Sequence, residues 1–418
     1  MNTKIDISKL YLIDKQWLAN LCLFLGTFVA YLGSLHPWFF WVMAEWYILL
    51  SLLFFFASVL ISNTLPSSTF FDKPNLRAII LFTILSVYIS ISFDSNLFGF
   101  INKLANVPLM YILMSIKPSV FLRIIDRICW CMGFFLLFSA IAFLLYLFGI
   151  SIPPRPDVFG DGAYSYDNYL LFMVANDREF MNFIPRFSSV FLEPGHLGTA
   201  TSLLLMTQFG KWQRWYNIVL IIVSAITFSL AAYAFLVALI FLNLWVQRKH
   251  IVGKAIIVGA LLGGVIGASF VYNDGDNMIQ NLILLRLEVD DKTGDIVGNN
   301  RVSEDFSNTF DKFFHSSDVV FGSSMQNATA GEGNSGYRVY IYEHGLVGLF
   351  LTLIFYLAIF KDFRDWRCLV SVAIISLMNF WVRGYPLWYS NLIPVMALIL
   401  DERFISNIEN RLPGVERL

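Results

Sequence analysis

Ionisable residues interrupt an apolar stretch near the middle of the chain. Arg186 precedes the apolar run, and Glu193 is followed by Pro194 and Gly195, which disfavour a regular helix at that point. Charged groups inside a membrane-embedded bundle are costly and therefore indicate a functional site. A carboxylate displayed at a broken helix could transfer a proton. The alternative is that Glu193 does no more than neutralise Arg186.

Three further arginines also lie close to apolar segments, namely Arg301, Arg338 and Arg383. A guanidinium group can donate two parallel hydrogen bonds to a phosphate and stays charged even when partly buried. Four arginines around one cavity would therefore suit an anionic, lipid-linked group. Taken singly, each arginine could instead extend to the lipid headgroups or pair with a carboxylate.

Two histidines are alternative candidates for a general base. His196 directly follows the Pro-Gly pair, and His344 lies in a later apolar segment, although either could be structural. Metal binding is not predicted, because the acidic pair Asp274 and Asp276 stands alone in an acidic loop. We expect neither a metal nor a cofactor.

The apolar segment that begins near residue 336 carries polar groups at helical spacing. Asn334, Arg338 and Tyr342 are four residues apart, so they share one face of a helix. Together with Tyr337 they could form the wall of a substrate pocket, in which tyrosines stack on sugar rings. The alternative for the tyrosines is an aromatic belt at the membrane interface.

The elements that position these residues are apolar helices. The chain has 418 residues, of which 57% are hydrophobic and only 14% are charged, whereas soluble domains carry about 25% charged residues. This composition predicts an all-α polytopic membrane protein with one membrane domain over residues 1–418. The net charge of −1 implies no attraction to nucleic acid. The four cysteines lie in or at the ends of apolar segments, so disulfides are not expected.

A membrane-spanning helix needs about 20 apolar residues, and we predict about twelve spans. The long apolar run at 215–246 is divided in two, because a single helix would be too long for a bilayer. The expected spans are 17–35, 38–62, 77–93, 97–116, 128–150, 187–209, 215–229, 231–246, 252–272, 336–360, 367–382 and 385–400.

Two long loops, residues 151–186 and 273–335, are acidic, whereas the short turns on the other side are basic. The positive-inside rule then places both loops outside and both termini in the cytoplasm. The second loop contains apolar patches and a helix-like stretch at Glu304–Phe314, so it is expected to fold over the membrane surface as a lid. No phosphate-binding loop is present, so chemistry on the outer face must use a substrate with its own leaving group.

Several motifs occur in an order that resembles a known family. Residues 186–195 resemble the segment that opens a middle span in Wzy-type polysaccharide polymerases, which are similar to the O-antigen ligases. A second family feature is an arginine followed by an apolar-Gly turn, matched by Arg301 and 320–322. The third is a polar-Gly-Tyr start to a helix with a later Gly-x-x-Gly, matched by 334–337 and 345–348.

This resemblance implies a GT-C-like membrane glycosyltransferase in the bacterial plasma membrane. Its donor and acceptor would be repeat units linked to undecaprenyl pyrophosphate, and a chain-length regulator and a flippase would be possible partners. An acceptor hydroxyl would attack the anomeric carbon of the donor, and lipid pyrophosphate would leave. Arg186 and Arg301 would then stabilise the phosphates without a metal, with Glu193 as the first candidate for the base and Arg338 and Tyr337 in the pocket wall.

Three alternatives remain open at the level of sequence, namely an O-antigen ligase, a transporter and a non-enzymatic membrane scaffold. Ligases carry a His-Asn pair at the start of the late helix, whereas this chain has Asn334 and Ser335, which favours a polymerase and leaves the base unassigned. A flippase or other secondary transporter could also have twelve spans. Transporters keep ionisable residues near the bilayer midplane, whereas those of this chain are expected at the outer ends of helices.

Overall fold

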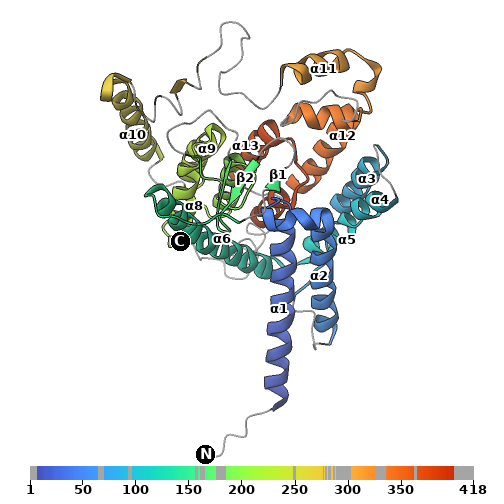
Figure 1. The fold of residues 1–418 in the computed structure, drawn as a ribbon. Helices are drawn as coiled ribbons and strands as arrows, with labels where there is room; N and C mark the ends of the chain where they lie inside the picture. The colour runs from blue at the N-terminus through green and yellow to red at the C-terminus, as the bar shows by residue number, and fades with distance from the viewer. Residues whose placement is uncertain are drawn as a thin grey trace, which may run out of the picture.

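The computed structural model is mostly helical over the residues that it describes (Figure 1). These residues are 7–64, 70–92, 97–155, 159–160, 165–175, 185–247, 251–275, 303–324, 336–361 and 365–399, with a few single positions between 277 and 288. The α-helices are α1 (Ile7–Gly33), α2 (Tyr47–Asn63), α3 (Leu76–Ser92), α4 (Leu97–Leu104), α5 (Asn106–Ser115), α6 (Pro118–Leu147), α7 (Pro194–Met206), α8 (Trp215–Ile226), α9 (Leu230–Gln247), α10 (Ile251–Val271), α11 (Glu304–Phe314), α12 (Tyr337–Phe360) and α13 (Trp366–Arg383). A last apolar helix spans Tyr389–Ile399.

The apolar helices agree with the expected class of an all-α membrane protein. In the described part of the chain, four helical stretches are long and apolar enough to cross a membrane, and several shorter apolar helices accompany them. The four long stretches are Asp14–Gly33, Pro118–Leu147, Tyr337–Phe360 and Trp366–Arg383. The number of twelve spans stays a prediction.

The long apolar run at 215–246 is divided into two helices, as predicted. Helix α8 ends at Ile226 and α9 begins at Leu230, and between them Phe228 has a positive φ of 48°. The side-chain oxygen of Thr227 accepts a hydrogen bond from the backbone N–H of Ser229 at 3.3 Å. Hydroxyl groups that bond to nearby backbone in this way favour turns over helix, which explains the break.

The segment predicted as one span at 97–116 is two short helices, α4 and α5. Pro108 lies in the first turn of α5, where its missing N–H would be unpaired in any case. Its ring would clash with the carbonyl group of Leu104 in a continuous helix, so α4 ends at that residue. The side chain of Asn106 donates to the carbonyl oxygen of Lys103 at 2.9 Å and stabilises the break.

Helix α7 begins seven residues later than the span predicted at 187–209. Glu193 is extended, with φ −137° and ψ 145°, and the helix begins at Pro194. The preceding residues pair with two other segments: Phe191 forms a β-bridge with Pro37, and the N–H of Met173 donates to the carbonyl oxygen of Ser189. Pairing of these backbone groups outside a helix allows the segment to be buried without orphaned donors.

The loop at 151–186 contains a small antiparallel sheet that the sequence analysis does not predict. Strands β1 (Phe159–Gly160), β2 (Ser165–Asn168) and β3 (Met173–Ala175) lie in the order β1-β2-β3. The turn between β2 and β3 rests on α6, because Ser139 donates its hydroxyl to the carbonyl oxygen of Leu171 at 2.7 Å. Strands of two to four residues carry too little alternation for a periodicity argument.

The largest core cluster joins α1 to α3, α5 to α9, α12, α13 and the last apolar helix. A second, smaller cluster lies where α11 packs on α12, and it includes Phe306, Phe310 and Tyr342. The helix predicted at Glu304–Phe314 is therefore confirmed with the same bounds, and Ser303 caps it by accepting from the N–H of Phe306. Helix α10 lies at the edge of the molecule (Figure 1).

Candidate functional site

An ion pair between Glu193 and Arg383 joins two helix ends that are far apart in sequence. The Nη1 atom of Arg383 donates to Oε2 of Glu193 at 2.9 Å, across a separation of 190 residues. Glu193 is the N-cap residue of α7 and Arg383 is the last residue of α13. The side chain of Arg383 is only 5% exposed, whereas that of Glu193 is 31% exposed, so the guanidinium group is buried and the carboxylate is partly accessible.

The guanidinium group of Arg383 has hydrogen-bonding capacity left over. Its Nε and Nη2 atoms are buried and have no hydrogen-bond partner. Buried donors that lack an acceptor are destabilising, and more so when they are charged. Gly195 lies directly against this group, since a Cβ atom there would collide with Nη2. The arrangement is a buried cationic fork with one arm paired and two donors available for an anion.

Two further polar side chains lie on the same face of α13 as Arg383. Ser376, Asn379 and Arg383 follow the spacing of three and four residues that aligns side chains on a helix. Both Oγ of Ser376 and Oδ1 of Asn379 are buried and lack a hydrogen-bond partner. Neither residue was predicted from the sequence, because a single hydroxyl or amide group in an apolar helix is a weak signal, and only the helical spacing from Arg383 marks them.

Arg186 lies beside the turn between α8 and α9. Its Nε atom is 3.4 Å from the carbonyl oxygen of Thr227 and donates to it, and the side chain is half-buried. The same turn reaches the fork described above, because the hydroxyl of Ser229 lies beside Gly195. The turn between α8 and α9 therefore contacts both the Arg186 segment and the start of α7, and it brings Arg186 into the same region as Arg383.

Aromatic rings border this region on the side of the last apolar helix. Trp388 stacks on Tyr385 with ring centroids 4.4 Å apart, and the ring of His196 lies 5.9 Å from Trp388. His36 approaches Trp388 from the loop after α1, at 5.3 Å. Burial lowers the pKa of His36, which favours its neutral imidazole. The acidic and basic side chains of this region are Glu193, Arg186 and Arg383.

The predicted pocket-wall residues Tyr337 and Arg338 are held in other contacts. Arg338 donates to the hydroxyl of Ser307 at 3.1 Å, and its guanidinium group lies over the ring of Phe310 at 5.7 Å. Tyr337 stacks on Trp381 of α13 with centroids 4.5 Å apart. Arg338 therefore fixes α11 to α12. Arg338 and Tyr342 share the face of α12 that packs on α11, as the spacing predicts.

His344 lies at a kink in α12. Gly345 leaves helical geometry, with φ 61° and ψ −174°, and the loop around Gly322 packs against the backbone at this point. The Nε2 atom of His344 is 3.8 Å from Oε2 of Glu343. Two motifs that the family resemblance groups together, 320–322 and 345–348, thus meet in space.

Tyr88 of α3 contacts both the loop at 320–322 and the kink in α12. Its hydroxyl oxygen lies 3.0 Å from the carbonyl oxygen of Phe321 and 2.9 Å from that of His344, so it can donate to either. The carbonyl of His344 needs this donor, because the kink at Gly345 interrupts the regular helix.

We expect Tyr88→Phe to destabilise the protein by about 1–2 kcal/mol, because it leaves the partly buried carbonyl group of His344 without a donor. Thermal unfolding in detergent, followed by tryptophan fluorescence, measures the effect. Tyr111→Phe is the control, since the side chain of Tyr111 is 47% exposed. Equal melting temperatures for wild type and Tyr88→Phe would show that the hydroxyl does not support the kink.

The remaining predicted site residues, Arg301 and Asn334, lie outside the described residues. Within the described residues, no group of three or more His, Cys, Asp or Glu side chains could hold a metal ion. All four cysteines are free. The structure thus brings together Arg186, Glu193, His196 and Arg383 and places Tyr337, Arg338 and His344 elsewhere.

Comparison with protein-family models, with curated proteins and with solved structures found no match for this chain. The family resemblance of the sequence motifs is therefore a proposal, supported by the chemistry of the residues described above.

Proposed function

We propose that this protein polymerises oligosaccharide repeat units linked to undecaprenyl pyrophosphate, on the outer face of a bacterial plasma membrane. The observation that carries the proposal is the buried guanidinium group of Arg383, whose Nε and Nη2 atoms lack an acceptor. A phosphate offers the two parallel acceptors that such a fork requires. Arg186 supplies a second cation in the same region.

In this mechanism, an acceptor hydroxyl group attacks the anomeric carbon of the donor sugar. The bond between that carbon and the pyrophosphate oxygen breaks, and the electron pair leaves with the lipid pyrophosphate. Arg383 and Arg186 stabilise the negative charge on the leaving oxygen. Glu193 orients Arg383 through their hydrogen bond, and its carboxylate group can accept the proton of the attacking hydroxyl group.

The lengths of the neighbouring helices support a recessed site. Helices α7 and α8 have 13 and 12 residues, which correspond to about 20 Å and 18 Å. The hydrocarbon core of a bilayer is about 30 Å thick. We place the ends of α7 and α8 at Met206 and Trp215 at the cytoplasmic surface of the hydrocarbon core. The opposite ends of these helices, next to Glu193 and Thr227, would then lie about 10 Å below its outer surface. This depth would exclude water, a competing acceptor for the glycosyl group.

The proposal includes a GT-C-like arrangement of about twelve spans with both termini in the cytoplasm. The acidic loops at 151–186 and 273–335 then lie outside, and α11 covers the outer end of α12 as part of a lid. A chain-length regulator and a flippase are the proposed protein partners, because a polymerase on the outer face depends on delivered repeat units.

Reconstitution of the purified protein with lipid-pyrophosphate-linked repeat units tests the proposal directly. We expect a ladder of products that grows by one repeat unit, without nucleotide and with no change on addition of EDTA, because arginines provide the positive charge. Substrate that stays unextended, under conditions in which the protein is folded, would refute the polymerase.

The arginines of the two outer loops are expected to be essential. Arg186→Ala and Arg301→Ala should each abolish elongation while the protein is still inserted, because charge on the leaving pyrophosphate would lose its stabilisation. Elongation per inserted protein, measured by gel ladder and immunoblot, gives the comparison. Full activity in both variants would exclude these residues from pyrophosphate binding.

A transporter is the second candidate, and one observation favours it. Helix α7 begins at Pro194, inside the span predicted at 187–209, and Gly195 in its first turn lies against the buried Arg383. Helix starts of this kind bind anionic groups in transporters. In the same liposomes, movement of intact lipid-linked units across the membrane without chain growth would assign the protein to this class.

A further inference from the structure

A separate cavity of about 670 Å³ lies at the opposite end of the bundle from Arg383, the end expected to be cytoplasmic. The first half of α6, the turn between α7 and α8, and the end of the last apolar helix line it. The proposed polymerase chemistry uses none of these residues.

The rim of this cavity is basic. Arg123 and Arg127 of α6 and Lys211 of the α7–α8 turn line it and are exposed. The single acidic residue among the described residues that line it is Asp126, which is already paired: Nη1 of Arg214 donates to its two oxygens at 2.6 and 2.7 Å. Three cations are therefore left to attract an anion.

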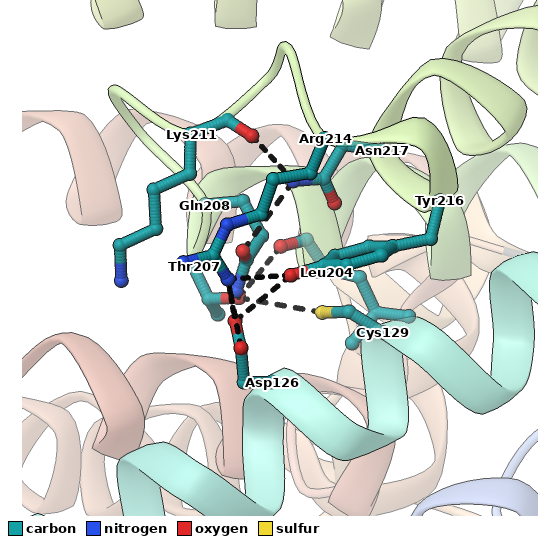
Figure 2. A network of polar contacts seen from close by, with 9 residues as sticks. All are labelled: Asp126, Cys129, Leu204, Thr207, Gln208, Lys211, Arg214, Tyr216 and Asn217. Atoms are coloured by element: carbon teal, nitrogen blue, oxygen red, sulfur yellow. Dashed lines mark hydrogen bonds and ion pairs between the residues drawn. The ribbon is translucent and has the colours of Figure 1, made fainter.

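Hydrogen bonds hold this charge distribution in place (Figure 2). The hydroxyl of Tyr216 donates to Oδ1 of Asp126 at 3.1 Å and accepts a hydrogen bond from Arg214. Asn217 donates to the carbonyl oxygen of Lys211 at 2.8 Å and fixes the turn that carries this lysine. The buried side chain of Gln208 also contributes polar groups to the cavity wall.

An exposed row of aromatic rings begins at the cavity and continues along α6. Trp130 lines the cavity and stacks on Phe134 with centroids 5.3 Å apart, and Phe134 lies 4.9 Å from Phe138. Each of the three side chains is 45–47% exposed. Eight residues of helix rise by about 12 Å, so the row is long enough to contact a large part of a hydrocarbon chain.

A basic cavity between membrane helices, next to an apolar track, matches the two halves of an anionic lipid. We propose that this cavity binds the phosphate group of an anionic phospholipid, whose hydrocarbon chain lies along Trp130, Phe134 and Phe138. The cations attract the phosphate group, and the aromatic row selects a lipid-borne phosphate over a soluble one.

Binding of short-chain lipids to the full-length protein in detergent tests the proposal. We expect dioctanoyl phosphatidic acid to bind more tightly than dioctanoyl phosphatidylcholine, whose headgroup has no net charge. Arg127→Gln with Lys211→Gln should weaken phosphatidic acid binding by about 30-fold, since each basic residue near such a headgroup contributes about 1 kcal/mol. Equal affinity for the two lipids would overturn the proposal.

A matched variant separates the cavity from general surface charge. Lys73→Gln with Arg77→Gln removes two exposed cations from another turn on the same expected face, outside the cavity, and should leave the affinity unchanged. An equal loss in this variant would overturn the cavity assignment, because bulk charge would then explain the binding.

A soluble phosphate ester distinguishes the two sources of the phosphate group. Glycerol 3-phosphate carries the same phosphate monoester without hydrocarbon chains, and we expect it to compete poorly. Phe134→Ala with Phe138→Ala should weaken the binding of the lipid and leave that of glycerol 3-phosphate unchanged. Competition by glycerol 3-phosphate at the same concentration as the lipid would overturn the lipid assignment.

Discussion

Arg383→Lys is expected to lower the rate of chain elongation by at least about 10²–10³-fold, because that is already the cost of removing a single preorganised donor from a developing oxyanion. Lysine keeps the positive charge that Glu193 requires, so the ion pair and the fold should survive. It lacks the planar fork, and therefore loses the Nε and Nη2 donors that have no acceptor in the protein. Elongation is measured as the rate of ladder growth per inserted protein.

Arg155→Lys is the matched control for this variant. Arg155 lies in the same loop as Arg186, with its guanidinium group over the ring of Trp38 at 5.0 Å, and it has no proposed contact with substrate. Its elongation rate should equal that of wild type. An Arg383→Lys protein that elongates chains at the wild-type rate would show that the unpaired donors do not bind the leaving group.

The comparison with Arg383→Ala is informative for a different reason. Removing the whole side chain leaves the carboxylate of Glu193 partly buried without its cation, and breaking a buried pair in this way costs about 3–5 kcal/mol. A loss of activity in Arg383→Ala could therefore come from unfolding. The lysine variant avoids this cost and isolates the hydrogen-bonding role of the guanidinium group.

Local sequence patterns predicted the elements whose causes are local. The helix at Glu304–Phe314 follows from its apolar spacing, and the break near Phe228 follows from a run too long for one span. The break at Leu104 was also available in the sequence, because Pro108 cannot continue a helix with that residue four positions before it. The segment 97–116 was predicted as one span because its composition is mostly apolar.

The candidate site depends on contacts that no local pattern contains. The sequence identified Glu193 and Arg383 separately and offered Arg186 as the partner of Glu193, because those two are neighbours in the chain. The pair with Arg383 joins residues 190 positions apart. It is set by how α13 packs near the start of α7. Asn379 was missed because a single amide in an apolar helix is a weak signal until its neighbours are known.

The charged groups at the two ends of the bundle differ in their degree of burial. Arg383 is enclosed, so it interacts in a medium of low dielectric constant, where a charge–charge contact is strong and salt has little effect. Arg127 and Lys211 are exposed, so their attraction for an anion is weaker and is screened by salt. Raised ionic strength should therefore reduce phosphatidic acid binding while leaving the Arg383 site occupied.

Gly345→Ala is expected to cause a large loss of stability. The backbone at Gly345 has φ 61° and ψ −174°, a region essentially restricted to glycine, and forcing alanine into it costs about 1–3 kcal/mol. A Cβ atom there would also collide with the backbone of residues 320–322, which cannot yield as a flexible side chain could. The kink and the loop would separate, and the melting temperature in detergent should fall.

Two other glycines resolve the causes of this loss. Gly149→Ala introduces strain alone, because its φ is 80° and nothing lies within 4 Å of the added Cβ. Gly259→Ala in α10 introduces neither strain nor collision, because Gly259 lies within a helix and nothing lies within 4 Å of the added Cβ atom. The melting temperatures should therefore rank Gly259→Ala highest, Gly149→Ala next and Gly345→Ala lowest. If Gly345→Ala and Gly149→Ala had the same melting temperature, the collision with residues 320–322 would contribute nothing beyond the backbone strain.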